Sequence, residues 1–150
     1  MASRKLVKTV SFPARSKPHM LRVSPDGKEV WVQTVDANTN VVLAADDLSV
    51  LATAPTGKAP VTNAWTPDRR YSIVTNGQDT FAQVFDAKTF KEVKRLLIGP
   101  GGSNIGFSKD GKTAFIALTG ANAVAVIDME TLAPAGQIRA GAAPQGLIVR

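Results

Sequence analysis

The sequence predicts an all-β protein built from a repeated sheet of four short antiparallel strands. Two observations predict this: a turn motif recurs at a fixed spacing, and each repeat holds short apolar runs bounded by Gly, Pro, Asn and Asp. The motif begins at residues 24, 66 and 108, a spacing of 42 residues. No insertion or deletion interrupts this register from residue 6 to residue 150, so the single region 1–150 divides into units 6–47, 48–89 and 90–131 and a partial unit 132–150.

Each unit opens with a segment that we expect to be an outer edge strand. Residues 90–98 alternate loosely between apolar and charged side chains, and residues 48–54 take the same place in the preceding unit. Charge on an exposed edge discourages pairing with other chains. A connection rich in Gly and Pro follows, and then a short inner strand at 20–23, 63–65 and 105–107.

The turn motif leads into the most apolar strand of each unit. This strand covers residues 30–33, 72–75 and 114–117, and such continuous apolar runs are typical of strands buried on both faces. We expect Trp31, and Trp65 of the inner strand, to lie in the core, because other units have apolar residues in their places. The last strand, at 41–43, 84–85 and 124–127, ends in a polar turn that leads to the next outer strand.

One residue departs from the turn motif. Arg69 stands where the other forms of the motif have Gly27 and Gly111. The Gly position of this turn requires positive φ, which costs a residue with a Cβ about 1–2 kcal/mol. We therefore expect Arg69 to be held at positive φ under strain.

Four antiparallel strands in about 40 residues describe a blade of a β-propeller. A helical solenoid has a similar period, but no window of 10 to 12 residues here has the 3.6-residue periodicity of a helix. The chain holds about 3.5 blades, whereas propellers close with four to eight. We expect the chain to start in an outer strand and to stop in an inner strand at 145–150, with uncovered faces at both ends. Two interpretations follow: part of a longer propeller, or a propeller completed by a second copy of the chain.

The amino-acid composition of the chain excludes several classes of function. The chain has 150 residues, 44% hydrophobic and 20% charged, with a mean hydropathy of +0.00, which is typical of a globular domain. It has no cysteine and one histidine, so a disulfide scaffold, a cysteine nucleophile and a two-histidine zinc motif are excluded. The N-terminal residues lack the apolar core of a secretory signal peptide.

Three segments resemble the YVTN-type β-propeller repeat: Ser24-Pro-Asp-Gly-Lys28, Ser72-Ile-Val-Thr-Asn76 and Val124-Ala-Val-Ile-Asp128. The resemblance implies a propeller that usually has seven blades, in surface-layer and exported proteins of archaea and bacteria. It implies an exported, periplasmic or cell-surface location. Members of this group include binding scaffolds, sugar-lactone lactonases and parts of haem or quinone redox enzymes. The first unit departs from the pattern, because Ala44 stands where the others have Asp86 and Asp128.

The candidate site residues are binding residues near the loops that lead into the inner strands. His19 is the one candidate base or metal ligand, but an acid–base or haem role needs partners that one unit does not supply. Arg15, Lys17, Arg22 and Lys58 form either an anion-attracting rim or a solvated cationic face. Asn63 and Asn104 are candidates to line a central channel. We expect no catalytic residue, no metal and no cofactor within these residues.

Most of the net charge lies at one end of the chain. Residues 1–28 contain seven basic side chains and one acid, Asp26, and so carry the whole net charge of +6. The basic residues are Arg4, Lys5, Lys8, Arg15, Lys17, Arg22 and Lys28. Such a cluster serves solubility and edge protection, or it attracts a polyanion. The sequence thus favours a non-catalytic binding or structural scaffold, with a protein or small-molecule ligand at the propeller face. The alternatives are part of a propeller enzyme, a lactonase or a haem- or quinone-linked oxidoreductase, and a basic surface that docks nucleic acid or an acidic partner.

Overall fold

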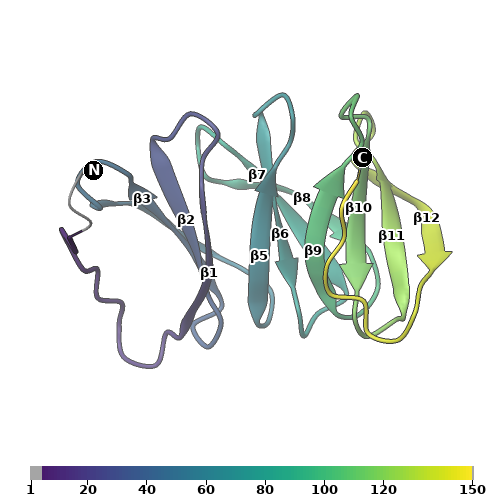
Figure 1. Cartoon of the computed structure of the whole chain (residues 1–150), viewed down its shortest axis with the longest axis horizontal. Coiled ribbons are helices and arrows are strands. Elements are labelled where there is room, and N and C mark those ends of the chain that lie inside the picture. The colour runs from purple at the N-terminus through teal and green to yellow at the C-terminus, as the bar shows by residue number, and fades with distance from the viewer. Residues whose placement is uncertain (1–4, 150) are drawn as a thin grey trace.

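The computed structural model describes residues 5–149, which form twelve β-strands and no helix (Figure 1). The strands make three four-stranded antiparallel sheets, each in the order of the sequence. The first sheet contains β1 (Pro18–Val23), β2 (Glu29–Thr34), β3 (Thr39–Ala44) and β4 (Val50–Pro55). The second contains β5 (Pro60–Trp65), β6 (Tyr71–Asn76), β7 (Phe81–Asp86) and β8 (Glu92–Leu97). The third contains β9 (Gly102–Phe107), β10 (Thr113–Leu118), β11 (Ala123–Asp128) and β12 (Ala133–Arg139).

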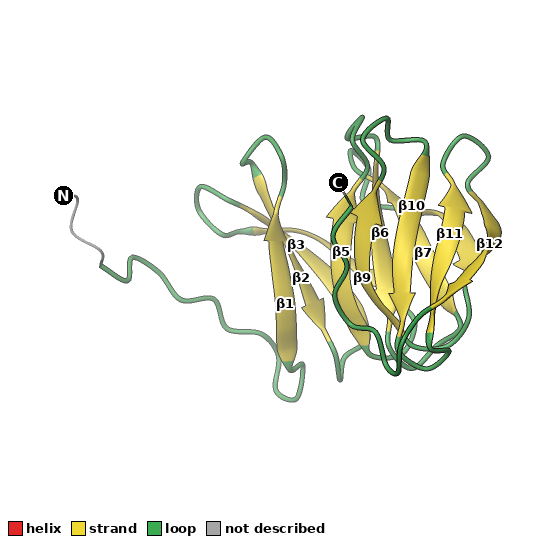
Figure 2. Cartoon of the chain, turned by 45° about the vertical axis from the view of Figure 1, so that its right-hand side comes forward, coloured by secondary structure: helices red, strands yellow, loops and turns green. Residues whose placement is uncertain are grey.

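The three sheets stand side by side and pack face to face (Figures 1 and 2). Their first strands, β1, β5 and β9, are neighbours in space, while the fourth strands lie at the outside. Each sheet begins 42 residues after the one before, and takes its first three strands from one sequence unit and its outer strand from the next. The predicted all-β class of repeated four-stranded antiparallel sheets is confirmed. Among residues 5–149 no helix is long and apolar enough to cross a membrane.

The two junctions between sheets differ in chemistry. The junction of the second and third sheets is a single apolar cluster that includes Ile73, Val84, Leu96, Ile116 and Ile127. The strands that supply it are the predicted apolar runs, and their central residues are buried. Every apolar side chain removed from water stabilises such a stack, by about 1.5–3 kcal/mol for a large aliphatic residue.

One part of the junction of the first and second sheets is a cluster of aromatic side chains around Trp31, which we call the aromatic cluster. The Trp31 ring is fully buried and lies 5.6 Å from that of Trp65, 6.3 Å from that of Phe85 and 6.0 Å from that of Phe90, each edge to face. Trp31 is thus a core residue as predicted, whereas Trp65 is only partly buried. Edge-to-face pairs add to the energy of burial because the positive ring edge meets the negative ring face.

The chain ends do not form the strands expected of them. Among the described residues, neither 6–12 nor 145–149 belongs to a strand. An outer strand pairs with the third strand of its own sheet and an inner strand pairs with the second, and for these two segments no such partner lies within residues 5–149. Both segments nevertheless cover a sheet: Val10 and Phe12 pack on the first sheet, and the C-terminal segment runs beside β9 (Figure 1), where Leu147 lies against Gly106.

The turn motif is built as predicted. Arg69 has φ 60°, close to the 76° of Gly27 and the 73° of Gly111. The Asp of each motif holds the turn, since Ser24 Oγ donates to Asp26 Oδ1 at 2.7 Å and Thr66 Oγ1 donates to Asp68 Oδ1 at 2.6 Å.

Arg69→Gly is expected to raise the free energy of unfolding by up to about 1 kcal/mol. It removes the strain of a left-handed residue, and this gain exceeds the cost of the extra conformational entropy that Gly gives the unfolded chain. Urea unfolding followed by tryptophan fluorescence measures the difference. Gly27→Ala creates the same strain in the first sheet, where an added Cβ meets no atom within 4 Å, and is expected to shift stability the other way. Equal or lower stability of Arg69→Gly would contradict this account of the turn.

Candidate functional site

Three turns meet at one end of the first two sheets. They are the β2–β3 turn (35–38), the β4–β5 connection (56–59) and the β6–β7 turn (77–80), and we call them the loop rim. Gly77 N donates to Ala59 O at 2.8 Å, and Ala59 N donates to Asn38 Oδ1 at 2.9 Å. Lys58 N donates to Asp79 Oδ2 at 2.5 Å. These bonds hold the three turns as one surface.

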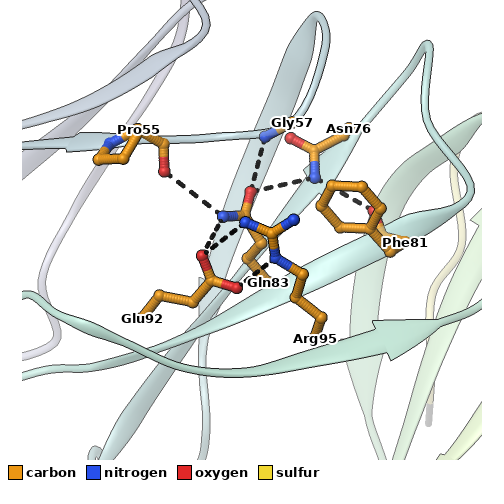
Figure 3. A network of polar contacts seen from close by, with 7 residues as sticks. All are labelled: Pro55, Gly57, Asn76, Phe81, Gln83, Glu92 and Arg95. Atoms are coloured by element: carbon orange, nitrogen blue, oxygen red, sulfur yellow. Dashed lines mark hydrogen bonds and ion pairs between the residues drawn. The ribbon is translucent and has the colours of Figure 1, made fainter.

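Gln83 of β7 lies beneath the loop rim and joins four elements (Figure 3). Its Oε1 accepts from Gly57 N at 2.8 Å and from Asn76 Nδ2 at 3.3 Å. Its Nε2 donates to Glu92 Oε2 at 2.7 Å and to Pro55 O at 3.4 Å. Gln83 is fully buried, so these bonds replace all of its contacts with water. The backbone of β4–β5 therefore depends on a side chain of the second sheet.

Gly57 is required at this place because its neighbours leave no room for a side chain. A Cβ built on Gly57 would lie 2.6 Å from Asp79 Oδ2 and 2.8 Å from Asn76 Cγ. The close approach lets the backbone amide of Gly57 reach the buried Gln83.

A second group of amides continues across the junction. Gln33 Nε2 of the first sheet donates to Asn40 Oδ1 at 2.9 Å and to Asn63 Oδ1 of the second sheet at 3.2 Å. Asn63 Nδ2 in turn donates to Ser72 Oγ at 2.9 Å. All four side chains are buried. Together with Asn76 and Gln83 they form what we call the polar junction.

Most of the polar junction has no counterpart at the next junction, where Thr75 takes the place of Gln33 and Leu118 that of Asn76. The residues 42 positions after Asn40, Asn63, Ser72 and Gln83 are Ala82, Ile105, Ala114 and Ala125, which are apolar and buried. Within residues 5–149, three buried side-chain N or O atoms have no hydrogen-bond partner, and all are in the polar junction: Gln33 Oε1, Asn40 Nδ2 and Asn76 Oδ1. Burying an unpaired amide atom costs about 1–3 kcal/mol, so these three atoms lower the stability of the polar junction.

Glu92 and Arg95 close the outer side of the polar junction. Arg95 Nε donates to Glu92 Oε1 at 2.6 Å, and the Arg95 guanidinium lies 4.7 Å from the centre of the Phe81 ring. Partial burial raises the pKa of Glu92, but the hydrogen bonds from Arg95 and Gln83 outweigh it and hold that pKa below its ordinary value. Glu92 is therefore ionised in the folded protein at neutral pH.

Glu92→Gln is expected to reduce the loss of stability in acid. Because the pKa of Glu92 is lower in the folded than in the unfolded chain, its ionised form stabilises the fold above about pH 4.5, and this contribution disappears as the pH falls through the folded pKa. Unfolding free energies at pH 6.5 and 3.5 should differ less in Glu92→Gln than in wild type, by about 0.5–1 kcal/mol. The turn carboxylates, such as Asp86, titrate alike in both proteins and cancel. Identical pH dependence would mean that Glu92 is not held by Arg95 and Gln83.

The structure brings two of the sequence-predicted site residues to this region. Asn63 lies in the polar junction, and Lys58 lies in the loop rim, although it is the backbone of Lys58 that bonds there. Asn63 was predicted to line a channel, but it is buried between the sheets. Asn104 is half-buried in β9, where its Oδ1 accepts from Ile105 N at 2.9 Å, away from the polar junction.

The other predicted site residues lie at the exposed edge of the first sheet. His19 and Arg22 are exposed in β1, and His19 Nδ1 is 3.3 Å from Val61 O. Arg15 and Lys17 stand in the preceding turn at φ 64° and 50°, and Lys17 Nζ is 3.9 Å from Asp36 Oδ1. Of the basic cluster, Arg4 lies outside the described residues. No group of three or more His, Asp or Glu that could hold a metal ion occurs in the described part of the chain.

Sequence reasoning missed Gln33, Asn40, Asn76 and Gln83. A signal for two of the four was present: when the units are aligned at 42 residues, Asn40 and Gln83 are polar where both other units are apolar. A polar residue in an apolar repeat position points to a junction that differs from its neighbours.

Comparisons with known proteins address the fold. No protein-family model and no curated protein sequence matches the chain. Hydrazine synthase from Kuenenia stuttgartiensis is similar in structure, with a TM-score of 0.82 and 25% identity over 94% of this chain and 41% of that one. A periplasmic gluconolactonase from Pseudomonas aeruginosa has a TM-score of 0.75 and 21% identity over 93% and 44% of the two chains. A putative 6-phosphogluconolactonase from Bacteroides uniformis has a TM-score of 0.77 and 17% identity over 89% and 44%.

The fold is that of a β-propeller. The three sheets are blades, and the polar junction lies between the first and second blades. The chain spans about two fifths of the length of the propeller proteins named above.

Proposed function

We propose that this chain is a β-propeller module of YVTN type that acts as a non-catalytic binding scaffold, with the loop rim as its ligand face. The observation that carries the proposal is the polar junction, where six buried polar side chains replace the hydrophobic packing of the next junction. Below the rim, Gln83 holds the backbone at Gly57 and Asn76 holds the backbone at Phe81, so a ligand seated there meets a rigid surface. Rigid support of this kind lowers the entropy cost of binding.

The chemistry of the rim favours a ligand with hydroxyl or amide groups. Asn and Gln side chains both donate and accept, and the rim also carries two negative charges, on Asp36 and Asp79, and one positive charge, on Lys58. A polyhydroxylated small molecule and a peptide backbone share these properties. The partner is therefore a protein or a small polar molecule.

Chemical-shift mapping on the ¹⁵N-labelled chain tests the ligand face. Probes are D-gluconate and an uncharged tetrapeptide, and the expected shifts cluster at residues 35–38, 56–59 and 77–80. Asn76→Ala should abolish them, while Asn104→Ala, a matched amide outside the polar junction, should leave them unchanged. Shifts that cluster elsewhere, or none with either probe, would contradict the proposed ligand face.

A propeller enzyme is the second candidate, because structures similar to this chain include proteins described as gluconolactonases and a haem-related dehydrogenase, NirN. Glucono-1,5-lactone hydrolysis separates the two: a scaffold leaves the rate equal to that in buffer. An acceleration that Asn76→Ala removes would replace the scaffold by a lactonase. Visible absorbance after addition of haem tests the redox form in the same way.

Docking of an acidic partner or nucleic acid is the third candidate. It rests on exposed basic side chains of the N-terminal segment and the first blade, which include Lys5, Lys8, Arg15 and Arg22. Retention on heparin that falls with salt, and that is lost when Lys5, Lys8 and Arg15 are replaced by Gln, would favour this function over the scaffold.

A further inference from the structure

A groove opens between the first and second blades at the end opposite the loop rim. It has a volume of about 340 Å³, and we call it the turn groove because the turn motifs of both blades line it. Strand β2, which has six residues, runs from this end of the first blade to the loop rim, so the two surfaces are separated by about 20 Å. Both walls belong to the first two blades, and the groove is formed without any further blade.

The two walls of the turn groove carry opposite charges. Asp26 and Glu29 line it from the first blade, whereas Arg69 and Lys88 line it from the second. The half-buried Trp65 of the second blade adds an aromatic surface. A molecule that lies across the groove therefore meets a negative wall on one side and a positive wall on the other.

These four charges do not neutralise one another by direct contact. Among residues 5–149, none of the four side chains takes part in an ion pair. The two carboxylates accept side-chain hydrogen bonds on one oxygen each, Asp26 Oδ1 from Ser24 Oγ at 2.7 Å and Glu29 Oε2 from Trp31 Nε1 at 2.9 Å. The second oxygen of each carboxylate and both cationic groups are therefore available to a ligand.

The equivalent groove at the next junction pairs its own charges. It has a volume of about 190 Å³ and is lined largely by residues 42 positions later in the sequence. Four of its five charged side chains pair within their own walls, Arg70 Nε with Asp68 Oδ2 at 2.6 Å and Lys112 Nζ with Glu130 Oε1 at 3.2 Å. The two grooves share one backbone, but only the turn groove has facing walls of opposite and unpaired charge.

The positive wall is present because two residues depart from the third blade. Arg69 stands where that blade has Gly111, and Lys88 stands where it has Glu130. Arg69 is held at φ 60°, a conformation that is unfavourable for a residue with a Cβ. Strained residues of this kind are found at binding sites, where the side chain has a role that offsets the strain. No ion pair of Arg69 within residues 5–149 supplies that role.

We propose that the turn groove binds a small zwitterion in which an ammonium group and a carboxylate are separated by an apolar chain. Arg69 and Lys88 bind the carboxylate, since Arg and Lys form charge-assisted hydrogen bonds to carboxylate oxygens. Asp26 and Glu29 accept from the ammonium group, and the apolar chain packs on Trp65. A free amino acid with a terminal ammonium group and a lysine at the C-terminus of a protein share this chemistry.

The probe is 6-aminohexanoate, and its matched controls are hexanoate and hexylamine, which each keep one of its two charges. Titration of the ¹⁵N-labelled chain should shift the indole N–H of Trp65 and the amides of residues 24–29, 67–70 and 86–89. The Kd of 6-aminohexanoate should be about tenfold lower than that of either control, because only the zwitterion satisfies both walls.

Two variants of the positive wall test the assigned contacts. Arg69→Gly should raise the Kd of 6-aminohexanoate about fivefold or more although it stabilises the fold, so the loss of binding is not a loss of structure. Lys88→Gln should raise the Kd to a similar extent. Lys91→Gln is the matched control, because Lys91 is exposed in the same β7–β8 turn but does not line the groove, and it should leave the Kd unchanged.

Equal Kd values for 6-aminohexanoate and hexanoate, or binding that neither Arg69→Gly nor Lys88→Gln weakens, would overturn the proposal. Lysine and Nα-acetyl-lysine distinguish the two sources of the ligand. Tighter binding of Nα-acetyl-lysine would assign the groove to a C-terminal lysine, and tighter binding of lysine would assign it to a free amino acid. None of these measurements involves residues of the loop rim, so they are independent of the proposed function.

Discussion

Trp31→Ala is expected to lower the free energy of unfolding by about 4 kcal/mol. Trp31 is fully buried, three aromatic rings surround it, and it links the first blade to the second. Its removal leaves a cavity that the neighbouring strands cannot fill, since they are fixed by their ladders on both sides. Contacts between blades are limited to neighbours, so the loss falls on one junction.

Urea unfolding of Trp31→Ala should therefore show two steps in place of one, with the first blade unfolding before the other two. Hydrogen exchange identifies the blade that opens first. Leu51→Ala is the matched control: Leu51 is 48% exposed in the same blade, and its loss should cost less than about 1 kcal/mol. If Trp31→Ala also lowered the free energy of unfolding by less than about 1 kcal/mol, the aromatic cluster would not be what holds the two blades together.

Gln83→Ala is expected to lower the free energy of unfolding by about 3 kcal/mol, because it leaves the buried Gly57 amide without its acceptor and removes one of the two acceptors of Asn76 Nδ2. It also removes a hydrogen bond that keeps the pKa of Glu92 low. The β4–β5 connection should loosen, and faster hydrogen exchange at Gly57 and Lys58 measures this directly.

Gln137→Ala is the control for the same side-chain type. Gln137 lies in the exposed strand β12 and donates one hydrogen bond, to Ile98 O at 2.9 Å. Its removal should cost less than about 1 kcal/mol. Equal effects of the two substitutions would show that the buried network under the loop rim is no stronger than a single surface hydrogen bond.

The fold followed from features that act locally and recur. Structure is specified over a few residues by the Pro-Asp-Gly turn and the apolar second strand, and both recur with the 42-residue period. Each repeat therefore predicts the same four-stranded sheet independently. The absence of a strand at residues 6–12 could not be predicted in this way, because a strand depends on its partner as well as on its own sequence. The chain keeps the packing of Phe12 while the ladder is missing.

The site was harder to predict than the fold. His19 and Arg22 were chosen for their chemistry and lie exposed, whereas Gln33 and Gln83 carry ordinary amides whose importance comes from burial. Burial of a polar residue depends on the neighbouring blade, so it is not encoded within one unit. Asn63 was identified because it falls on the inner strand, yet it faces a neighbour and not a channel.

The buried amides between the first and second blades also make the pairing of these two blades specific. An apolar surface tolerates any apolar neighbour of suitable shape, whereas the bond from Gln33 to Asn63 is formed only when the correct two faces meet. The blades share one backbone structure and one repeat length, so this hydrogen bond is what distinguishes the correct pair of neighbouring blades from an incorrect pair. The order of the blades is thereby specified by buried polar side chains, although selection for stability alone would have replaced these side chains by apolar ones.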